Sequence, residues 1–225
     1  MRECAGLHGS GRRLPCVTSP SAPAVLRLAV RFIASHNLRV QLVGDEHLPK
    51  DGPALLVARR AHPFYDSIAL LDTLPRLPHL VVGLGWLRDP LLRPLAETAC
   101  KLLEWPAAMH GEHLDDREAG ALETGSALLR RGEVLAAYSE GSGALNAEII
   151  LPALLTLLEH AQGSGERRIP IIPVGFRYAR DEDVWNVTIR LGAASYLDSP
   201  GDRALTLDQI LARARALSGD ALERG

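Results

Sequence analysis

A histidine and an aspartate stand four residues apart at the point where a short apolar run of the sequence ends. The run spans residues 54–58, and His62 and Asp66 follow it on either side of Pro63. If the chain turns helical after Pro63, residues four apart share one face, so the Asp66 carboxylate reaches the ring of His62. The carboxylate then fixes the imidazole tautomer, and the free ring nitrogen can accept a proton from a hydroxyl. The pair predicts a general base with its orienter, although a surface hydrogen bond or a helix-start cap would use the same spacing.

A second polar loop follows another apolar run, residues 134–138, and reads Ser139-Glu140-Gly141-Ser142-Gly143. Its two glycines allow a tight turn, and the N–H groups at the start of a following helix can face an anion or a developing oxyanion. Glu140 can accept a hydrogen bond from an acceptor hydroxyl or neutralise a nearby arginine. An ordinary strand-to-helix turn would use the same residues. A serine-hydrolase elbow is excluded, because neither Ser139 nor Ser142 has a glycine both two residues before and two residues after it.

The elements that must position these loops alternate between strand and helix patterns. Short β-rich runs predict strands over residues 38–43, 54–58, 80–84, 134–138, 170–176 and 184–191. Longer periodic segments predict helices over 67–74, 91–100, 115–131, 144–161 and 207–217. This alternation predicts a single α/β domain with a mixed, largely parallel sheet covered by helices. Ligands gather at the carboxyl ends of strands in such sheets, and both polar loops follow strands. Whether the two loops share one edge cannot be read from the sequence.

Length and composition bound the class of protein. The chain has 225 residues and a formal net charge of -2, which favours one domain and gives no electrostatic reason to expect nucleic-acid binding. Its three cysteines, Cys4, Cys16 and Cys100, are an odd number with two in the N-terminal tail, a pattern that suggests neither a disulfide framework nor a metal cluster. His110 and His113 precede Asp115 and Asp116, but no further ligand pair follows and helix capping accounts for both aspartates. We therefore predict no metal site.

The N-terminal end is basic. Residues 1–21 show no periodicity and are expected to form a flexible basic tail, and residues 22–225 are expected to form the domain. Residues 22–33 are apolar but contain Arg27 and Arg31, and they fall short of the about 20 apolar residues that a bilayer span needs. We expect this segment to pack on the domain, with membrane contact as an addition. No secretory signal is apparent, so we expect a cytoplasmic protein.

Four blocks in order resemble the glycerol-phosphate and lysophosphatidate (lysophospholipid) acyltransferase family. Residues 43–58 look like the lead-in to the family's first motif, in which a His and an Asp follow, and residues 138–142 resemble its Phe-Pro-Glu-Gly-Thr block. Residues 91–105 occupy the place of an apolar helix that leads to its second motif. The stretch Ile169-Pro170-Ile171-Ile172-Pro173-Val174 resembles its late proline-bearing strand. The resemblance covers roughly residues 25–195.

The resemblance implies transfer of an acyl group from a thioester donor, acyl-CoA or acyl carrier protein, to a lipid or lysolipid hydroxyl in lipid synthesis. His62 would be the base and Asp66 its orienter, Glu140, Gly141 and Ser142 would bind the acceptor, and Pro173 would be a structural element of its motif. No cofactor other than the donor is implied. The implied location is cytoplasmic, peripheral on the inner face of the cell membrane.

The sequence departs from the family pattern in three places. Three residues separate His62 from Asp66 where the family has four, and no arginine stands near residues 103–107 or at Gly143, where the family has arginines. Arginine is the usual ligand for a phosphate group. These departures keep open an alternative, a non-catalytic relative that binds an acyl chain or lipid in the same groove.

Overall fold

The computed structural model describes residues 38–59, 62, 65–83, 102–105, 116–138, 147–163, 168–182, 184–197 and 203–219. The predicted tail, the segment 22–33, the helix 91–100 and the loop residues Glu140, Gly141 and Ser142 lie outside the described residues. So do His110 and His113.

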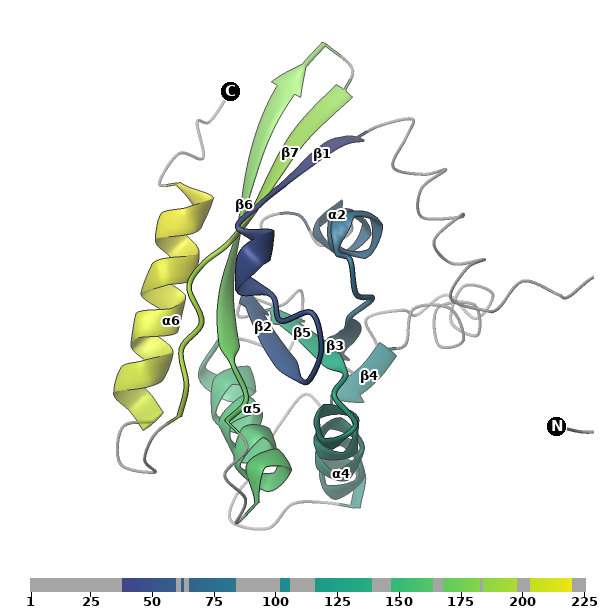
Figure 1. The fold of residues 1–225 in the computed structure, drawn as a ribbon, viewed down its shortest axis with the longest axis vertical. Helices are drawn as coiled ribbons and strands as arrows, with labels where there is room; N and C mark the ends of the chain where they lie inside the picture. The colour runs from purple at the N-terminus through teal and green to yellow at the C-terminus, as the bar shows by residue number, and fades with distance from the viewer. Residues whose placement is uncertain are drawn as a thin grey trace, which may run out of the picture.

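A seven-stranded sheet, in the order β1-β7-β6-β2-β5-β3-β4, forms the centre of the described fold (Figure 1). All neighbouring strands run parallel except β6 and β7, which are antiparallel. The predicted mixed and largely parallel sheet is therefore confirmed. The strands are β1 (Leu38–Val43), β2 (Ala54–Ala58), β3 (His79–Gly83), β4 (Leu102–Trp105), β5 (Val134–Tyr138), β6 (Ile171–Asp181) and β7 (Val184–Leu191).

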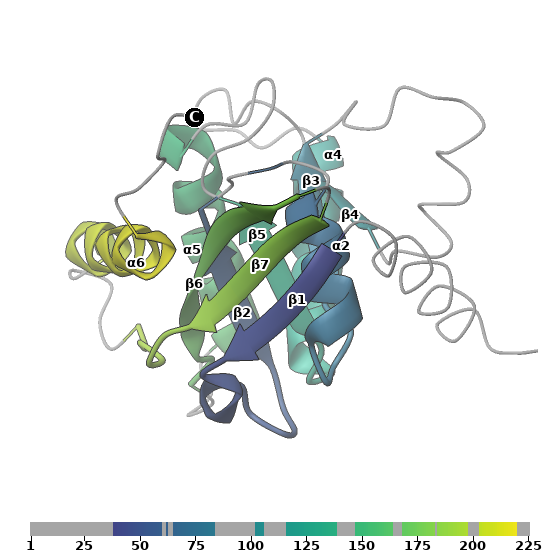
Figure 2. The same ribbon diagram turned by 90° about the horizontal axis from the view of Figure 1, so that it is seen from above.

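Helices cover both faces of this sheet, as Figure 2 shows for α2 and α6. Alternate residues of β2 enter two separate cores, because side chains alternate across a strand. Leu56 packs with α2 residues such as Leu70, and Leu55 packs with residues of α4, α5 and α6 such as Leu157. Every residue of β2 and β5 is buried, which explains their continuous apolar sequences. The helices are η1 (Asp45–His47, 3-10), α2 (Tyr65–Thr73), α4 (Asp116–Arg130), α5 (Ala147–Gln162) and α6 (Arg203–Ser218).

The strand and helix predictions hold with small shifts in their bounds and one missed strand. The bounds of β1, β2, β5 and β7 are those predicted, whereas β3 is displaced by one residue and β6 continues to Asp181. The described helices begin or end within a few residues of their predicted limits. No strand was predicted at residues 102–105, which follow the predicted helix 91–100 and lie in the segment compared with an apolar helix of the family. They form β4, which pairs in parallel with β3. Four residues without alternation carry no readable strand period, so pairing with β3 decides their conformation.

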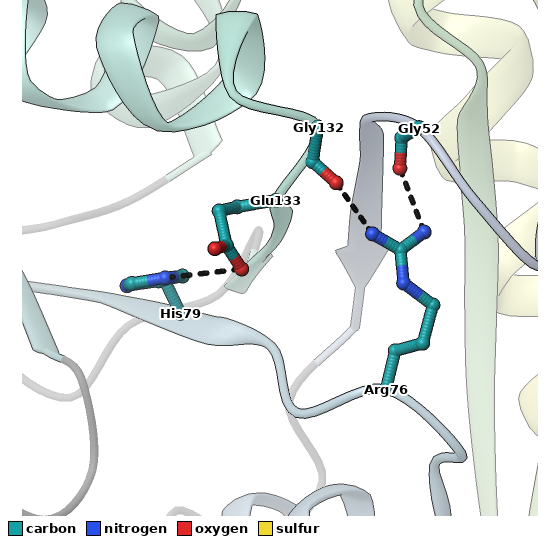
Figure 3. Close-up of polar contacts among 5 residues, drawn as sticks. All are labelled: Gly52, Arg76, His79, Gly132 and Glu133. Carbon is teal, nitrogen blue, oxygen red and sulfur yellow. Dashed lines mark hydrogen bonds and ion pairs between the residues drawn. The ribbon is translucent and has the colours of Figure 1, made fainter. Parts of the chain in front are cut away.

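One arginine ties together the two loops that lead into the central strands. The Arg76 guanidinium donates hydrogen bonds to the carbonyl oxygens of Gly52 (2.6 Å), which precedes β2, and of Gly132, which precedes β5 (Figure 3). It also donates to the carbonyl oxygen of Pro49 (3.1 Å), in the same loop as Gly52. Gly52 and Gly132 have φ of 86° and 84°, a conformation that favours glycine. The loops at the amino ends of β2 and β5 are thus held together by one side chain, at the edge opposite to the carboxyl ends.

Candidate active site

The two strands that precede the polar loops end at the same edge of the sheet. β2 and β5 are parallel neighbours, and the last residues of the two strands, Ala58 and Tyr138, are partners in the ladder. This answers the question that the sequence left open, because the chain leaves both strands side by side at their carboxyl ends. Clustering of functional groups at such an edge is the rule in open α/β sheets.

His62 and Asp66 lie together, but their contact differs from the one expected. The Asp66 N–H donates to the His62 carbonyl oxygen (3.0 Å), and the His62 main-chain N–H donates to Asp66 Oδ2 (2.9 Å). We expected the carboxylate to reach the imidazole ring. Among the described residues, the hydrogen bonds between the two instead run through the main chain of His62, in the manner of an acidic side chain that reaches back to cap a helix. The helix-start cap, the alternative left open above, is therefore the contact observed.

Asp66 is nevertheless no ordinary surface cap. Its side chain is 0 % exposed, and a buried carboxylate is costly unless it is hydrogen-bonded. Its second oxygen, Oδ1, accepts a hydrogen bond from the hydroxyl of Tyr178 on β6. Each carboxylate oxygen thus accepts a hydrogen bond, Oδ2 from the main chain of His62 and Oδ1 from Tyr178.

Tyr178 is a site residue that the sequence analysis missed. Burial first, and then the charge and hydrogen bond of Asp66, raise the pKa of Tyr178 well above its ordinary value. Its hydroxyl therefore remains a donor at every physiological pH. The predicted strand ended at residue 176, although the inward positions of β6 continue from Phe176 to Tyr178. A strand drawn two residues longer would have placed Tyr178 on the core side.

Three aromatic rings surround the His62 imidazole. Ring centroids lie 4.9 Å away for Tyr178, 5.8 Å for Trp185 and 6.0 Å for Tyr65. The Tyr178 and Tyr65 rings meet the imidazole in T-shaped arrangements, which are favoured geometries for aromatic pairs. Trp185 also lies under the Arg180 guanidinium, 5.7 Å from the ring centroid to Cζ. Packing from α2, β6 and β7 thus restricts the direction in which the imidazole can point.

A further hydrogen bond joins the start of α2 to the end of β5. The Ser67 and Tyr138 hydroxyls lie 3.1 Å apart, and both side chains are buried. Ser67 follows Asp66 directly, and Tyr138 is the last residue before the loop that contains Glu140. This contact therefore fixes the spacing between the helix that carries Asp66 and the strand that leads to the second loop.

Pro173 lies on β6, as predicted, beside Val57 of β2. Its carbonyl oxygen accepts a hydrogen bond from the Gly192 N–H (2.9 Å), just beyond the last paired residues of β6 and β7. The N and C=O of one strand residue point the same way, so the Pro173 nitrogen also faces the β7 side and not β2. The missing N–H of proline removes no rung of the β2–β6 ladder there, which explains how a proline is tolerated inside a sheet.

Two further features bear on what the described residues can bind. Within the described ranges, no three His, Cys, Asp or Glu side chains are grouped so as to hold a metal ion. No helix in the same ranges is both long and apolar enough to cross a membrane.

Comparison with known proteins identifies a shared fold. No family model and no curated protein matches the sequence. Among solved structures, the chain is similar to the crystal structure of the 1-acyl-sn-glycerophosphate (LPA) acyltransferase, PlsC, from Thermotoga maritima, with a TM-score of 0.55 and 12 % sequence identity. The alignment covers 90 % of this chain and 83 % of the other. The α/β architecture expected from the sequence resemblance is therefore the one the chain adopts.

Proposed function

We propose that this protein is an acyltransferase that moves a fatty acyl group from acyl-CoA or acyl carrier protein to the hydroxyl of a lipid or lysolipid. The observation that carries the proposal is the position of His62, which lies beyond the carboxyl end of β2 beside a buried carboxylate and within a fold shared with an LPA acyltransferase. The four ordered sequence blocks support the same reaction class.

In the proposed reaction, His62 is the general base. Its ring nitrogen takes the proton of the acceptor hydroxyl while the hydroxyl oxygen attacks the thioester carbonyl carbon. The tetrahedral intermediate collapses with cleavage of the carbon–sulfur bond, and the sulfur leaves with the proton that His62 received. A thioester requires no protein nucleophile for this transfer, and a positioned base contributes about 10²- to 10⁴-fold in rate.

Asp66 keeps the orienting role in this proposal, acting through the main chain of His62. Its carboxylate holds the loop from which the imidazole projects, and its negative charge close by favours the imidazolium that forms during transfer. Glu140, Gly141 and Ser142, on the loop after β5, are proposed to bind the acceptor and the developing oxyanion.

The proposed acceptor sets the proposed location. Lipid hydroxyls are presented at a membrane surface, so we propose that the protein works peripherally on the inner face of the cell membrane, in the cytoplasm. The basic N-terminal sequence suits contact with anionic headgroups.

A second candidate is a non-catalytic relative that binds an acyl chain or lipid. The capping contact between Asp66 and the main chain of His62 favours it, because a carboxylate placed only to start a helix needs no catalytic histidine. The absence of arginine at the two positions described above also favours it.

Thiol release from a medium-chain and a long-chain acyl-CoA tests the proposal. The acceptors are lysophospholipid, glycerol phosphate, diacylglycerol and glycolipid, and the proteins are wild type, His62→Ala and His160→Ala. His160 is an exposed histidine on α5, which packs on the other core, so its variant is the matched control. We expect acceptor-dependent release that falls at least about 100-fold in His62→Ala and is unchanged in His160→Ala.

Other outcomes assign the protein differently. Equal release by wild type and His62→Ala excludes His62 as the base. Lipid binding without release, unchanged in His62→Ala, identifies a binding protein. Release without any acceptor identifies a thioesterase.

A further inference from the structure

Tyr178 lies on the part of β6 that continues past its pairing with β2. β6 pairs with β2 only as far as Val174, and from there its partner is β7, with Tyr178 opposite Val187. We call this part of β6, with the paired part of β7, the β6–β7 arm. The arm, with β1 paired to β7, runs beside α2 in Figure 1. The arm brings Tyr178 to Asp66 although the two residues are 112 positions apart in the sequence.

The Tyr178 side chain holds His62 in two ways. Its hydroxyl donates to Asp66 Oδ1, and Asp66 Oδ2 accepts from the His62 main-chain N–H, so the hydroxyl fixes the carboxylate that fixes the loop. Its ring also meets the imidazole directly, at 4.9 Å between centroids and 63° between planes. The first contact sets where the His62 backbone lies, and the second limits how the ring turns.

This hold does not depend on the protonation state of His62. The raised pKa of Tyr178 keeps its hydroxyl protonated through the whole range in which a histidine titrates. A donor that stays in place while the imidazole gains and loses a proton suits a base that must return to one geometry in each turnover.

We infer that Tyr178 is a positioning residue, which aims the His62 imidazole at the acceptor hydroxyl through the Asp66 carboxylate and by direct ring contact. The catalytic consequence rests on the proposed acyl transfer, whereas the ring-fixing effect does not. A small displacement of a catalytic base costs up to about 100-fold in rate, so the loss of this positioning belongs in kcat rather than in KM.

The test compares Tyr178→Phe, which removes only the hydroxyl, with Tyr196→Phe, which removes the hydroxyl of a 43 % exposed tyrosine. One readout needs no substrate: the NMR signals of the His62 ring in histidine-labelled protein, assigned by their loss in His62→Ala. In wild type we expect nuclear Overhauser contacts between the His62 and Tyr178 ring protons. In Tyr178→Phe we expect a shifted or broadened His62 signal, and in Tyr196→Phe the wild-type signal.

The second readout is thiol release. We expect Tyr178→Phe to lower kcat about 10- to 100-fold with KM within about twofold, and Tyr196→Phe to change neither. Missing contacts in wild type, or a His62 signal in folded Tyr178→Phe identical to wild type, would overturn the inference. So would a kcat equal to wild type. If wild type releases no thiol with any acceptor, the proposed function fails, and the NMR signals alone still decide whether Tyr178 fixes the ring.

Discussion

Replacing Arg76 should cost this protein a large part of its stability, because one guanidinium bonds three carbonyl oxygens from two loops. A hydrogen bond to a charged group contributes about 1.5–3 kcal/mol when it is well buried. Arg76 and the three glycine and proline acceptors are half-buried, so water recovers part of each bond, and about 1 kcal/mol per bond is a fair value. We expect Arg76→Met to lower the free energy of unfolding by about 3 kcal/mol.

The Arg76 experiment has two matched variants. Arg76→Lys keeps the charge but lacks the planar fork, so it should recover only about 1 kcal/mol of the loss. Arg131→Met removes an exposed arginine next to the same loop and should change the free energy of unfolding by less than about 0.5 kcal/mol.

Urea unfolding followed by circular dichroism measures these differences, with a thermal scan as a second assay. For a domain of this size a loss of 3 kcal/mol corresponds to a Tm lower by roughly 6–12 °C. If the free energies of unfolding of Arg76→Met and Arg131→Met differ by less than about 0.5 kcal/mol, the reasoning is refuted. That result would mean that the loops before β2 and β5 keep their positions without the Arg76 hydrogen bonds.

Three other predictions concern packing and ionisation. A Cβ at Gly175 would lie 2.5 Å from the Leu217 backbone, so Gly175→Ala should lower the free energy of unfolding in urea by about 1–3 kcal/mol. Gly120 lies on a helix, and a Cβ there would meet no atom within 4 Å outside its own helix backbone, so Gly120→Ala should raise the free energy of unfolding by about 0.5–1 kcal/mol. Equal effects of the two substitutions would contradict this reasoning. Leu157, on α5, is 0 % exposed in the core between α5 and the sheet. Leu157→Ala should lower the free energy of unfolding by about 2–5 kcal/mol in the same assay, and a decrease below about 1 kcal/mol would contradict this. Folding raises the pKa of Tyr178 above its ordinary value of 10.0. As the pH rises above 10, the unfolded chain therefore loses the Tyr178 hydroxyl proton while the folded protein keeps it. The free energy of unfolding of wild type should then fall by about 1.4 kcal/mol per pH unit above pH 10, relative to that of Tyr178→Phe. If the free energies of unfolding of the two proteins change equally with pH, the Tyr178 hydroxyl is not buried as described.

The central strands could be predicted because their sequences admit few alternatives. β2 and β5 are continuous apolar runs of five residues bounded by polar, glycine or proline positions, which is typical of strands buried on both faces. β4 could not be predicted, since its sequence Leu-Leu-Glu-Trp has no period and its conformation depends on pairing with β3.

The candidate site could be predicted only in its local part. His62 and Asp66 were found from their spacing and from the strand before them. A spacing of i and i+4 allows the Asp66 carboxylate to reach either the ring or the main chain of His62. In the structure Asp66 Oδ2 binds the main chain, while Oδ1 accepts a hydrogen bond from Tyr178, which lies far along the sequence. Contacts of this range depend on which strand the fold brings next to α2, and no local sequence pattern encodes that.

The parallel pairing of β1 with β7 has a consequence for synthesis of the chain. β1 is hydrogen-bonded at the sheet edge to a strand that the ribosome makes about 150 residues later, which takes roughly 7–30 s at ordinary translation rates. Tyr178 is also made long after Asp66, so the hydrogen bond between them forms only when β6 has been synthesised. The nascent chain therefore carries an open sheet edge and an unfinished site until its last third emerges, and this protein is expected to depend on chaperones most strongly just before that point.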